Sequence, residues 1–220
     1  CTPPMNRDIR FEHVSFGYDG EHKVLEDVNA TIPAGSTFAI LGSTGSGKST
    51  LMHLLNRLYD LPPENGRITI GGVDIADMKA DWVRENVGMV LQEPFLFSRT
   101  IGENIGIASR ELSLTEMREA AHIACIDETI DSLTKGYDTI VGERGVTLSG
   151  GQKQRAAIAR TLTRQTPILV FDDSLSAVDA QTDVLIRTRL RERMKDSTVI
   201  LISHRITTLM EADQIMVMDK

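Results

Sequence analysis

The stretch Gly42-Ser43-Thr44-Gly45-Ser46-Gly47-Lys48-Ser49 decides how the rest of the sequence is interpreted. It fits the pattern G-x-x-x-x-G-K-[ST], in which backbone N–H groups turn inward around a phosphate and the lysine reaches the outer phosphates of a nucleotide. An apolar run, 37–41, precedes it, and a helical pattern, 50–58, follows it. The helix N-terminus adds positive partial charge. The stretch therefore predicts a phosphate-binding loop, with a flexible Gly/Ser turn as the plain alternative, and Thr50 joins the candidate nucleotide contacts.

A phosphate loop that works with a metal ion also needs a carboxylate, and the sequence supplies one. The apolar run 168–171 ends at Asp172, and ligands of open α/β sheets bind at the carboxyl ends of the strands. We therefore expect Ser49 to ligate Mg²⁺ and Asp172 to hold it through water. Without the phosphate loop, Asp172 would be interpreted as the cap of the next turn.

The remaining apolar pattern predicts two kinds of strand. Segments 9–16 and 25–32 space their apolar residues as antiparallel strands with one exposed face do. Short unbroken apolar runs are instead typical of strands buried on both faces of a parallel sheet. Such runs occupy 37–41, 87–91, 168–171, 199–202 and 215–218.

Helical patterns separate several of these runs. An apolar helical stripe follows the phosphate loop at Leu51, Leu54, Leu55 and Leu58. Strand signals are few from Pro94 to about residue 165. Within this segment Ser113 and Glu116 form a capping box, which indicates the start of a helix. We therefore predict an α/β fold whose nucleotide-binding core, 8–92 and 166–220, carries an antiparallel β-subdomain and an inserted α-helical subdomain, 93–165.

Composition excludes several classes of protein. The chain has 24 Lys and Arg against 31 Asp and Glu, a net charge of −7, which argues against a general nucleic-acid binder. The 2 cysteines cannot build a disulfide framework or a four-cysteine zinc site. Every apolar run is much shorter than the ~20 residues that cross a bilayer. A strand pattern that stops at the last residue leads us to expect a domain cut from a longer protein.

The segment Leu148-Ser149-Gly150-Gly151-Gln152 points to a family. It lies between the phosphate loop and the strand of Asp172, and a helical pattern, 153–163, follows it. In this order, the motifs resemble those of ATP-binding-cassette (ABC) ATPases over nearly the whole chain. The resemblance implies a P-loop NTPase (RecA-like) core.

The same resemblance implies cofactors and partners. In ABC proteins two cassettes pack head to tail, and each ATP, with Mg²⁺, lies between the phosphate loop of one and the signature loop of the other. Here that loop would be Ser149, Gly150, Gly151 and Gln152, whose helix N-terminus can offer donors to a γ-phosphate. The partners are then a second nucleotide-binding domain and the transmembrane domain of the same transporter, at the cytoplasmic face of a membrane, and no nucleic acid.

Three single residues and one segment also match the family by resemblance. Tyr18 is similar to the aromatic residue that stacks on adenine, although an aromatic face does not separate ATP from GTP and Tyr18 alone would suit a strand. Gln92 resembles the glutamine that senses and ligates Mg²⁺. Segment 174–179 resembles the D-loop, which crosses the dimer interface. His204 resembles the histidine that touches the γ-phosphate.

Two further segments favour an exporter over an importer. Segment 139–145 resembles the part of exporter cassettes that contacts the coupling helices of the membrane domain. It contains Glu143 and Arg144, which alone would be interpreted as a solvated turn. Segment 92–98 also resembles exporters.

One residue departs from the pattern of hydrolysing cassettes. The residue after the metal-binding aspartate is usually the glutamate that orients the attacking water, and here it is Asp173. Its side chain is shorter by one methylene, or ~1.5 Å, and a misplacement of ~1 Å can cost about 10²-fold in rate.

Asp173 leaves more than one function open. The chain could be the slow, ATP-binding half of a heterodimeric exporter whose partner supplies the glutamate. It could instead be a homodimeric motor in which Asp173 is a tolerated base that works through a second water. A third class, soluble ABC ATPases acting on DNA or the ribosome, carries a long coiled coil or a second cassette that this chain lacks.

Overall fold

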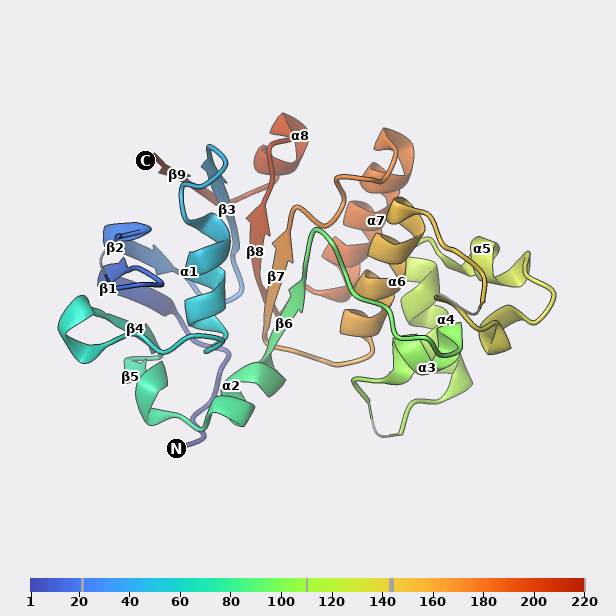
Figure 1. Ribbon diagram of the computed structural model, residues 1–220, viewed down its shortest axis with the longest axis horizontal. Helices are drawn as coiled ribbons and strands as arrows, with labels where there is room; N and C mark the ends of the chain where they lie inside the picture. Colours follow the sequence, from blue (N-terminus) through green and yellow to red (C-terminus); the bar gives the residue numbers. More distant parts are fainter. Residues whose placement is uncertain (21, 110, 143–144, 220) are drawn as a thin grey trace. The chain divides into compact units, whose positions relative to one another are not determined.

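The computed structural model describes every residue except 21, 110, 143–144 and 220, and Figure 1 labels its elements. The chain divides into two compact units, which are described separately. Unit 1 contains residues 1–88, 166–172 and 196–220, and unit 2 contains residues 89–165 and 173–195.

An antiparallel sheet forms the first part of unit 1. Among the described residues its strand order is β2-β1-β4-β5. The strands are β1 (Ile9–Phe16), β2 (Leu25–Ile32), β4 (Arg67–Ile70) and β5 (Val73–Asp74). In β1 the apolar residues predicted to face the core are buried, and register shifts on either side of Val14 mark irregular pairing with β2. The expected antiparallel strands are thus confirmed.

A second sheet carries the buried strands. In the described part of the chain it has five strands in the order β6-β7-β8-β3-β9. They are β3 (Thr37–Gly42), β6 (Val87–Val90), β7 (Ile168–Asp172), β8 (Thr198–Ile202) and β9 (Gln214–Met218), and the unit boundary falls within β6. Strand β3 pairs in parallel with β8 and β9, and β7 pairs in parallel with β8. Every residue of β7 is buried, as its unbroken apolar run predicts.

Helix α1 (Lys48–Leu55) begins and ends earlier than its apolar stripe predicts. It starts at Lys48 because Gly47 adopts the left-handed conformation, with φ 90°. It is over before Arg57, a non-glycine residue with φ 52°. Leu58 is therefore 56% exposed and does not continue the buried stripe. The short elements η1 (Pro63–Asn65), η2 (Ile75–Asp77), α2 (Ala80–Asn86) and α8 (Ile206–Leu209) complete unit 1.

Unit 2 is helical. Its elements are α3 (Ile101–Gly106), α4 (Leu114–Ile123), α5 (Asp127–Asp131), η3 (Gly136–Asp138), α6 (Gly150–Leu162) and α7 (Ala180–Arg193). Helix α6 packs against α3 and α4, and the capping box predicted at Ser113 and Glu116 is present. The segment predicted as a helical insertion, 93–165, lies in unit 2 together with α7.

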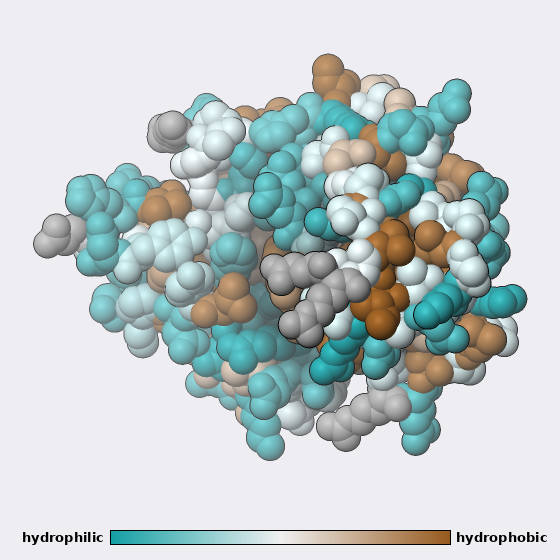
Figure 2. Space-filling model, turned by 45° about the vertical axis from the view of Figure 1, so that its right-hand side comes forward, coloured by the Kyte–Doolittle hydropathy of each residue, from teal (hydrophilic) through white to brown (hydrophobic). Residues whose placement is uncertain are grey.

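The described residues include no membrane-spanning helix. None of their helices is both long enough and apolar enough to cross a bilayer. On the face drawn in Figure 2, hydrophobic residues gather in small groups between hydrophilic ones.

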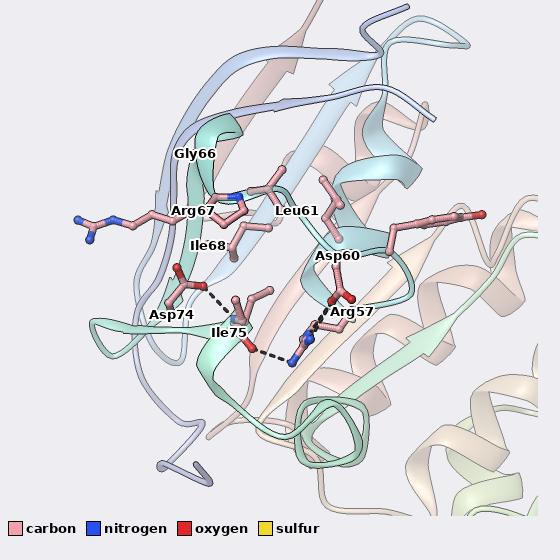
Figure 3. Close-up of a pocket in the computed structure, with 12 residues that line it drawn as sticks. Arg57, Asp60, Leu61, Gly66, Arg67, Ile68, Asp74 and Ile75 are labelled. Atoms are coloured by element: carbon pink, nitrogen blue, oxygen red, sulfur yellow. Dashed lines mark hydrogen bonds and ion pairs between the residues drawn. The ribbon is translucent and has the colours of Figure 1, made fainter. Parts of the chain in front are cut away.

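A small cavity in unit 1 is lined by Arg57, which holds the chain at the end of α1. Its volume is about 60 Å³, well below the ~300 Å³ of small-molecule sites, so it is a packing feature. At its wall Arg57 Nη1 donates to the carbonyl oxygen of Ile75 (3.2 Å) and Nη2 donates to Asp60 (2.8 Å) (Figure 3). Nη1 also donates to the carbonyl oxygen of Met78 (2.7 Å). Arg57 thus ties the chain after α1 to η2.

We expect Arg57→Ala to lower the free energy of unfolding by about 2 to 3 kcal/mol, because the backbone oxygens of Ile75 and Met78 lose a charged donor. Arg67 lines the same cavity but is largely exposed and pairs with Glu12, so Arg67→Ala should cost less than ~1 kcal/mol. Urea unfolding of both variants measures the difference. Equal losses would contradict the anchoring role of Arg57.

Candidate functional site

The phosphate-loop sequence lies between β3 and α1 in unit 1, and its backbone requires glycine (Figure 1). Gly45 and Gly47 have φ of 79° and 90°, which side-chain-bearing residues rarely adopt. A Cβ on Gly42 would lie 2.5 Å from the Met218 oxygen, and one on Gly47 would lie 2.5 Å from Leu25 Cδ2. The turn is closed by a hydrogen bond from Ser46 N–H to the Ser43 oxygen (3.1 Å). The loop is therefore a built turn and not a flexible linker.

Lys48 places its charge inside this loop. The residue is 8% exposed, and its Nζ donates to the carbonyl oxygens of Gly42 (2.6 Å) and Ser43 (2.8 Å). Nζ also lies 3.4 Å from Ser46 Oγ. An ammonium group held by the loop's own carbonyls is already where a bound phosphate would need a cation.

Ser49 and Asp172 meet although 123 residues separate them in the sequence. Ser49 Oγ donates to Asp172 Oδ2 at 2.7 Å, and Asp172 ends the buried strand β7. A hydroxyl and one carboxylate fit Mg²⁺, which keeps several waters and takes its other oxygens from phosphates. The described residues contain no cluster of three His, Cys, Asp or Glu that would suit a transition metal.

Tyr18 is held from the side and leaves much of its ring open. Its hydroxyl lies 2.8 Å from Thr50 Oγ1, and its ring meets those of Phe16 and Tyr59 edge-on, at centroid distances of 5.2 and 5.1 Å. Tyr18 is still 52% exposed, as a stacking platform must be. Tyr59 belongs to none of the predicted motifs, and its only signal in the sequence is an aromatic residue just after α1.

His204 also belongs to unit 1, two residues beyond the end of β8, and it is exposed. Unit 1 therefore holds the phosphate loop, Tyr18, Asp172 and His204. The other predicted site residues, Gln92, Asp173 and 149–152, belong to unit 2.

The signature segment forms the capped start of α6. Ser149 Oγ accepts from Gln152 N–H (3.2 Å), and Gln152 Oε1 accepts from Ser149 N–H (2.9 Å). The predicted helix therefore begins at Gly150, three residues before the 153 expected from its apolar pattern. A Cβ on Gly151 would lie 2.6 Å from the Ala177 oxygen, so this turn of α6 approaches the backbone of segment 174–179 closely.

The segment after β7 is a tight loop. Asp173 has φ 48°, and its carbonyl oxygen accepts from Ser176 N–H (3.2 Å). At the far end Asp179 caps α7, and hydrogen bonds from the backbone and side chain of Thr182 lower the pKa of Asp179. Glu143 and Arg144 of the exporter-like segment lie outside the described residues.

Two residues of α6 that belong to none of the predicted motifs, Gln154 and Arg160, connect parts of unit 2. Gln154 is 3% exposed and contacts Gln92 and segment 174–179. Arg160 donates to Asn104 and to the Phe95 oxygen, and burial lowers the pKa of Arg160. No local signal marks either one, since their partners are distant in the sequence.

Comparison with known proteins assigns the chain to a family. The profile described as ABC transporter matches residues 25–176. The chain belongs to the ABC transporter family. The expected P-loop α/β fold and the expected exporter type are thereby confirmed. The chain is an ATP-binding ABC domain of the exporter type, and domains of this type are ATPases.

The relatives are similar over almost the full chain. It is 43% identical over 98% of its length to an ATP-dependent lipid A-core flippase of Haemophilus influenzae, and 42% identical over 100% to the alpha-hemolysin translocation ATP-binding protein of Escherichia coli. A bacterial Atm1-family ABC exporter with ATP bound matches 99% of it with a TM-score of 0.94 and 43% identity. The chain spans only 37%, 31% and 38% of these proteins, respectively.

The phosphate loop yields a matched pair of glycine tests. Gly35 and Gly47 both have positive φ, but a Cβ on Gly35 meets nothing within 4 Å. We expect Gly35→Ala to cost about 1 kcal/mol of backbone strain and Gly47→Ala to cost a further ~1 to 3 kcal/mol from the clash with Leu25. Urea unfolding measures the free energy of unfolding of the two variants. Equal losses would show that the loop shifts to remove the clash with Leu25.

Proposed function

We propose that this chain binds MgATP and hydrolyses it to drive the export of a substrate across a membrane. The observation that carries the proposal is the phosphate loop around Lys48, with the Ser49 to Asp172 hydrogen bond beside it. A loop of N–H donors, a buried cation and a hydroxyl–carboxylate pair match a nucleotide's phosphates and its metal ion. In this proposal the core is 8–92 with 166–220, and 93–165 is the signature subdomain.

Each candidate residue has a chemical task. The loop N–H groups hold the β-phosphate, Lys48 reaches the β- and γ-phosphates, and Tyr18 stacks on the purine base. Ser49, Asp172 and Gln92 would hold Mg²⁺, which neutralises charge on the phosphate oxygens when bound. Asp173 orients the attacking water, and His204 contacts the γ-phosphate.

The signature loop implies a partner. Ser149 caps α6 through its Oγ, and with the glycine backbone after it forms a helix start that suits a γ-phosphate held by another domain. We propose that a second nucleotide-binding domain supplies that phosphate and that the transmembrane domain of the same transporter receives the motion, at the cytoplasmic face. The relatives, which are longer exporters, and the charge of −7 support this arrangement over nucleic-acid binding.

Asp173 favours a second candidate, the slow half of a heterodimeric exporter. Its φ of 48° is a conformation that aspartate tolerates better than most residues, but the side chain still lacks one methylene. In this candidate the loop at 149–152 completes the partner's active site, while the chain's own site turns over slowly. The competing homodimer keeps Asp173 as a tolerated base.

We expect Asp173→Glu to raise the steady-state rate of MgATP hydrolysis by about 10- to 100-fold, because the longer carboxylate recovers ~1.5 Å of reach. If the chain is the slow half of a heterodimer, the parent should lie close to a Lys48→Ala blank. Rates measured over a series of protein concentrations also reveal whether activity depends on association. A parent that already turns over well, with less than about a twofold gain in Asp173→Glu, would favour the homodimeric motor instead.

Tyr18 allows its stacking and its hydrogen bond to be separated. We expect Tyr18→Ala to weaken ATP binding about 10-fold, which corresponds to ~1.4 kcal/mol of lost ring contact. Tyr18→Phe removes only the hydroxyl bonded to Thr50 and should change affinity less than about threefold. Titration with a fluorescent ATP analogue measures both. Equal weakening in the two variants would assign the effect to the hydroxyl and contradict stacking.

A further inference from the structure

Gln154 is a buried polar residue whose side-chain amide makes almost all of the hydrogen bonds that it can make, within unit 2. It lies in α6 and is 3% exposed. Its Nε2 donates to the Gln92 carbonyl oxygen (2.8 Å) and to Ser176 Oγ (3.0 Å), and its Oε1 accepts from Ala177 N–H (3.0 Å). A side-chain amide offers two donors and two acceptor lone pairs, so only one lone pair is left over.

The partners fix which way the amide points. The Gln92 carbonyl can only accept, and the Ala177 N–H can only donate. Exchanging the amide oxygen and nitrogen would therefore turn both hydrogen bonds into repulsive contacts. Gln154 is specific for this pair of backbone groups.

These contacts join two places that the proposed function treats separately. Gln92 follows β6 and is a candidate ligand of Mg²⁺. Ser176 and Ala177 belong to the loop that starts at Asp173, and Ser176 N–H donates to the Asp173 oxygen. One side chain thus spans from the residue that would sense the metal to the loop that carries the candidate base.

The chain after Gln92 is fixed to α6 at a second point. Arg160 Nη1 donates to the Phe95 oxygen (2.9 Å), and Arg160 Nη2 donates to Asn104 Oδ1 (3.1 Å). Asn104 in turn holds both the N–H (2.8 Å) and the carbonyl (3.0 Å) of Phe97. Segment 92–97 is therefore bound to α6 near both of its ends, and a shift of this segment would be passed to α6.

We propose that Gln154 is a positioning residue that couples Gln92 to the loop 173–179, so that nucleotide and metal bound at the phosphate loop order the loop carrying Asp173. This inference rests on the proposed function. Gln154 does not touch the reacting groups, and its effect is exerted through the Gln92 carbonyl on one side and Ala177 N–H on the other.

Two substitutions separate this coupling from simple packing. Gln154→Glu keeps the shape and keeps an acceptor for Ala177 N–H and the Ser176 hydroxyl, but it sets a carboxylate oxygen against the Gln92 carbonyl. Gln154→Met keeps the length and removes all three hydrogen bonds. Arg118→Gln, at an exposed position on α4, makes the same change of charge as Gln154→Glu and serves as its control.

Hydrogen–deuterium exchange of the complete protein that contains this chain, with and without MgATP, tests the coupling. In the parent and in Arg118→Gln, MgATP should slow exchange both in the phosphate loop, 42–49, and in 173–179. In Gln154→Glu the phosphate loop should stay protected, while the slowing in 173–179 falls by at least about fivefold. Without nucleotide, Ala177 N–H should exchange as in the parent in Gln154→Glu and faster in Gln154→Met.

The two segments distinguish the ways in which the inference can fail. A protected phosphate loop, with equal slowing of 173–179 in the parent and in Gln154→Glu, would overturn the coupling and leave the proposed function in place. A parent whose phosphate loop gains no protection from MgATP would overturn the proposed function, and the coupling with it. Faster exchange throughout Gln154→Glu without nucleotide would show a purely structural role and also overturn the coupling.

Discussion

The hydrogen bond between Ser49 and Asp172 depends on the register of three parallel strands. Ile202 of β8 is the partner of Ile40 in β3 and also of Asp172 in β7. This shared partner brings the carboxyl end of β7 level with the start of the phosphate loop. A slip of one residue between strands would turn the Asp172 side chain to the other face of the sheet. The site residues of unit 1 are therefore positioned by strand pairing as much as by the loop itself.

Local sequence was sufficient to predict a structural element wherever the interaction that forms the element is local. The turn at 42–49 could be predicted from its own glycines, and the capping box from Ser113 and Glu116 alone. Strand β7 could be predicted from its unbroken apolar run. Helix α1 shows the opposite case. Its apolar stripe continues to Leu58, but the helix stops earlier because Arg57 bonds to carbonyl oxygens 18 and 21 residues further on. Such a tertiary contact overrides the periodicity that predicted the longer helix.

Gln154 and Tyr59 could not be predicted from the sequence for the same physical reason, which is that their contacts are with residues distant in the sequence. Gln154 contacts groups 62, 22 and 23 residues away in the sequence. The fold places the ring of Tyr59 beside that of Tyr18, which follows β1. A glutamine in a helix and a tyrosine after one are ordinary in composition, and only the folded structure shows that Gln154 is a buried connector and that Tyr59 contacts the ring of Tyr18.

The position of Asp173 bears on the hydrolysis proposed for this chain. A shortened side chain can be compensated if its backbone moves forward by ~1.5 Å. Here the Asp173 carbonyl is tied to Ser176 N–H, and Ser176 and Ala177 are tied to Gln154 in a helix packed against α3 and α4. Advancing Asp173 would therefore break or strain these partly buried hydrogen bonds, each of which contributes about 0.5 to 1.5 kcal/mol. The loop that presents the carboxylate also fixes its backbone, so side-chain length at this position is not easily exchanged for backbone movement.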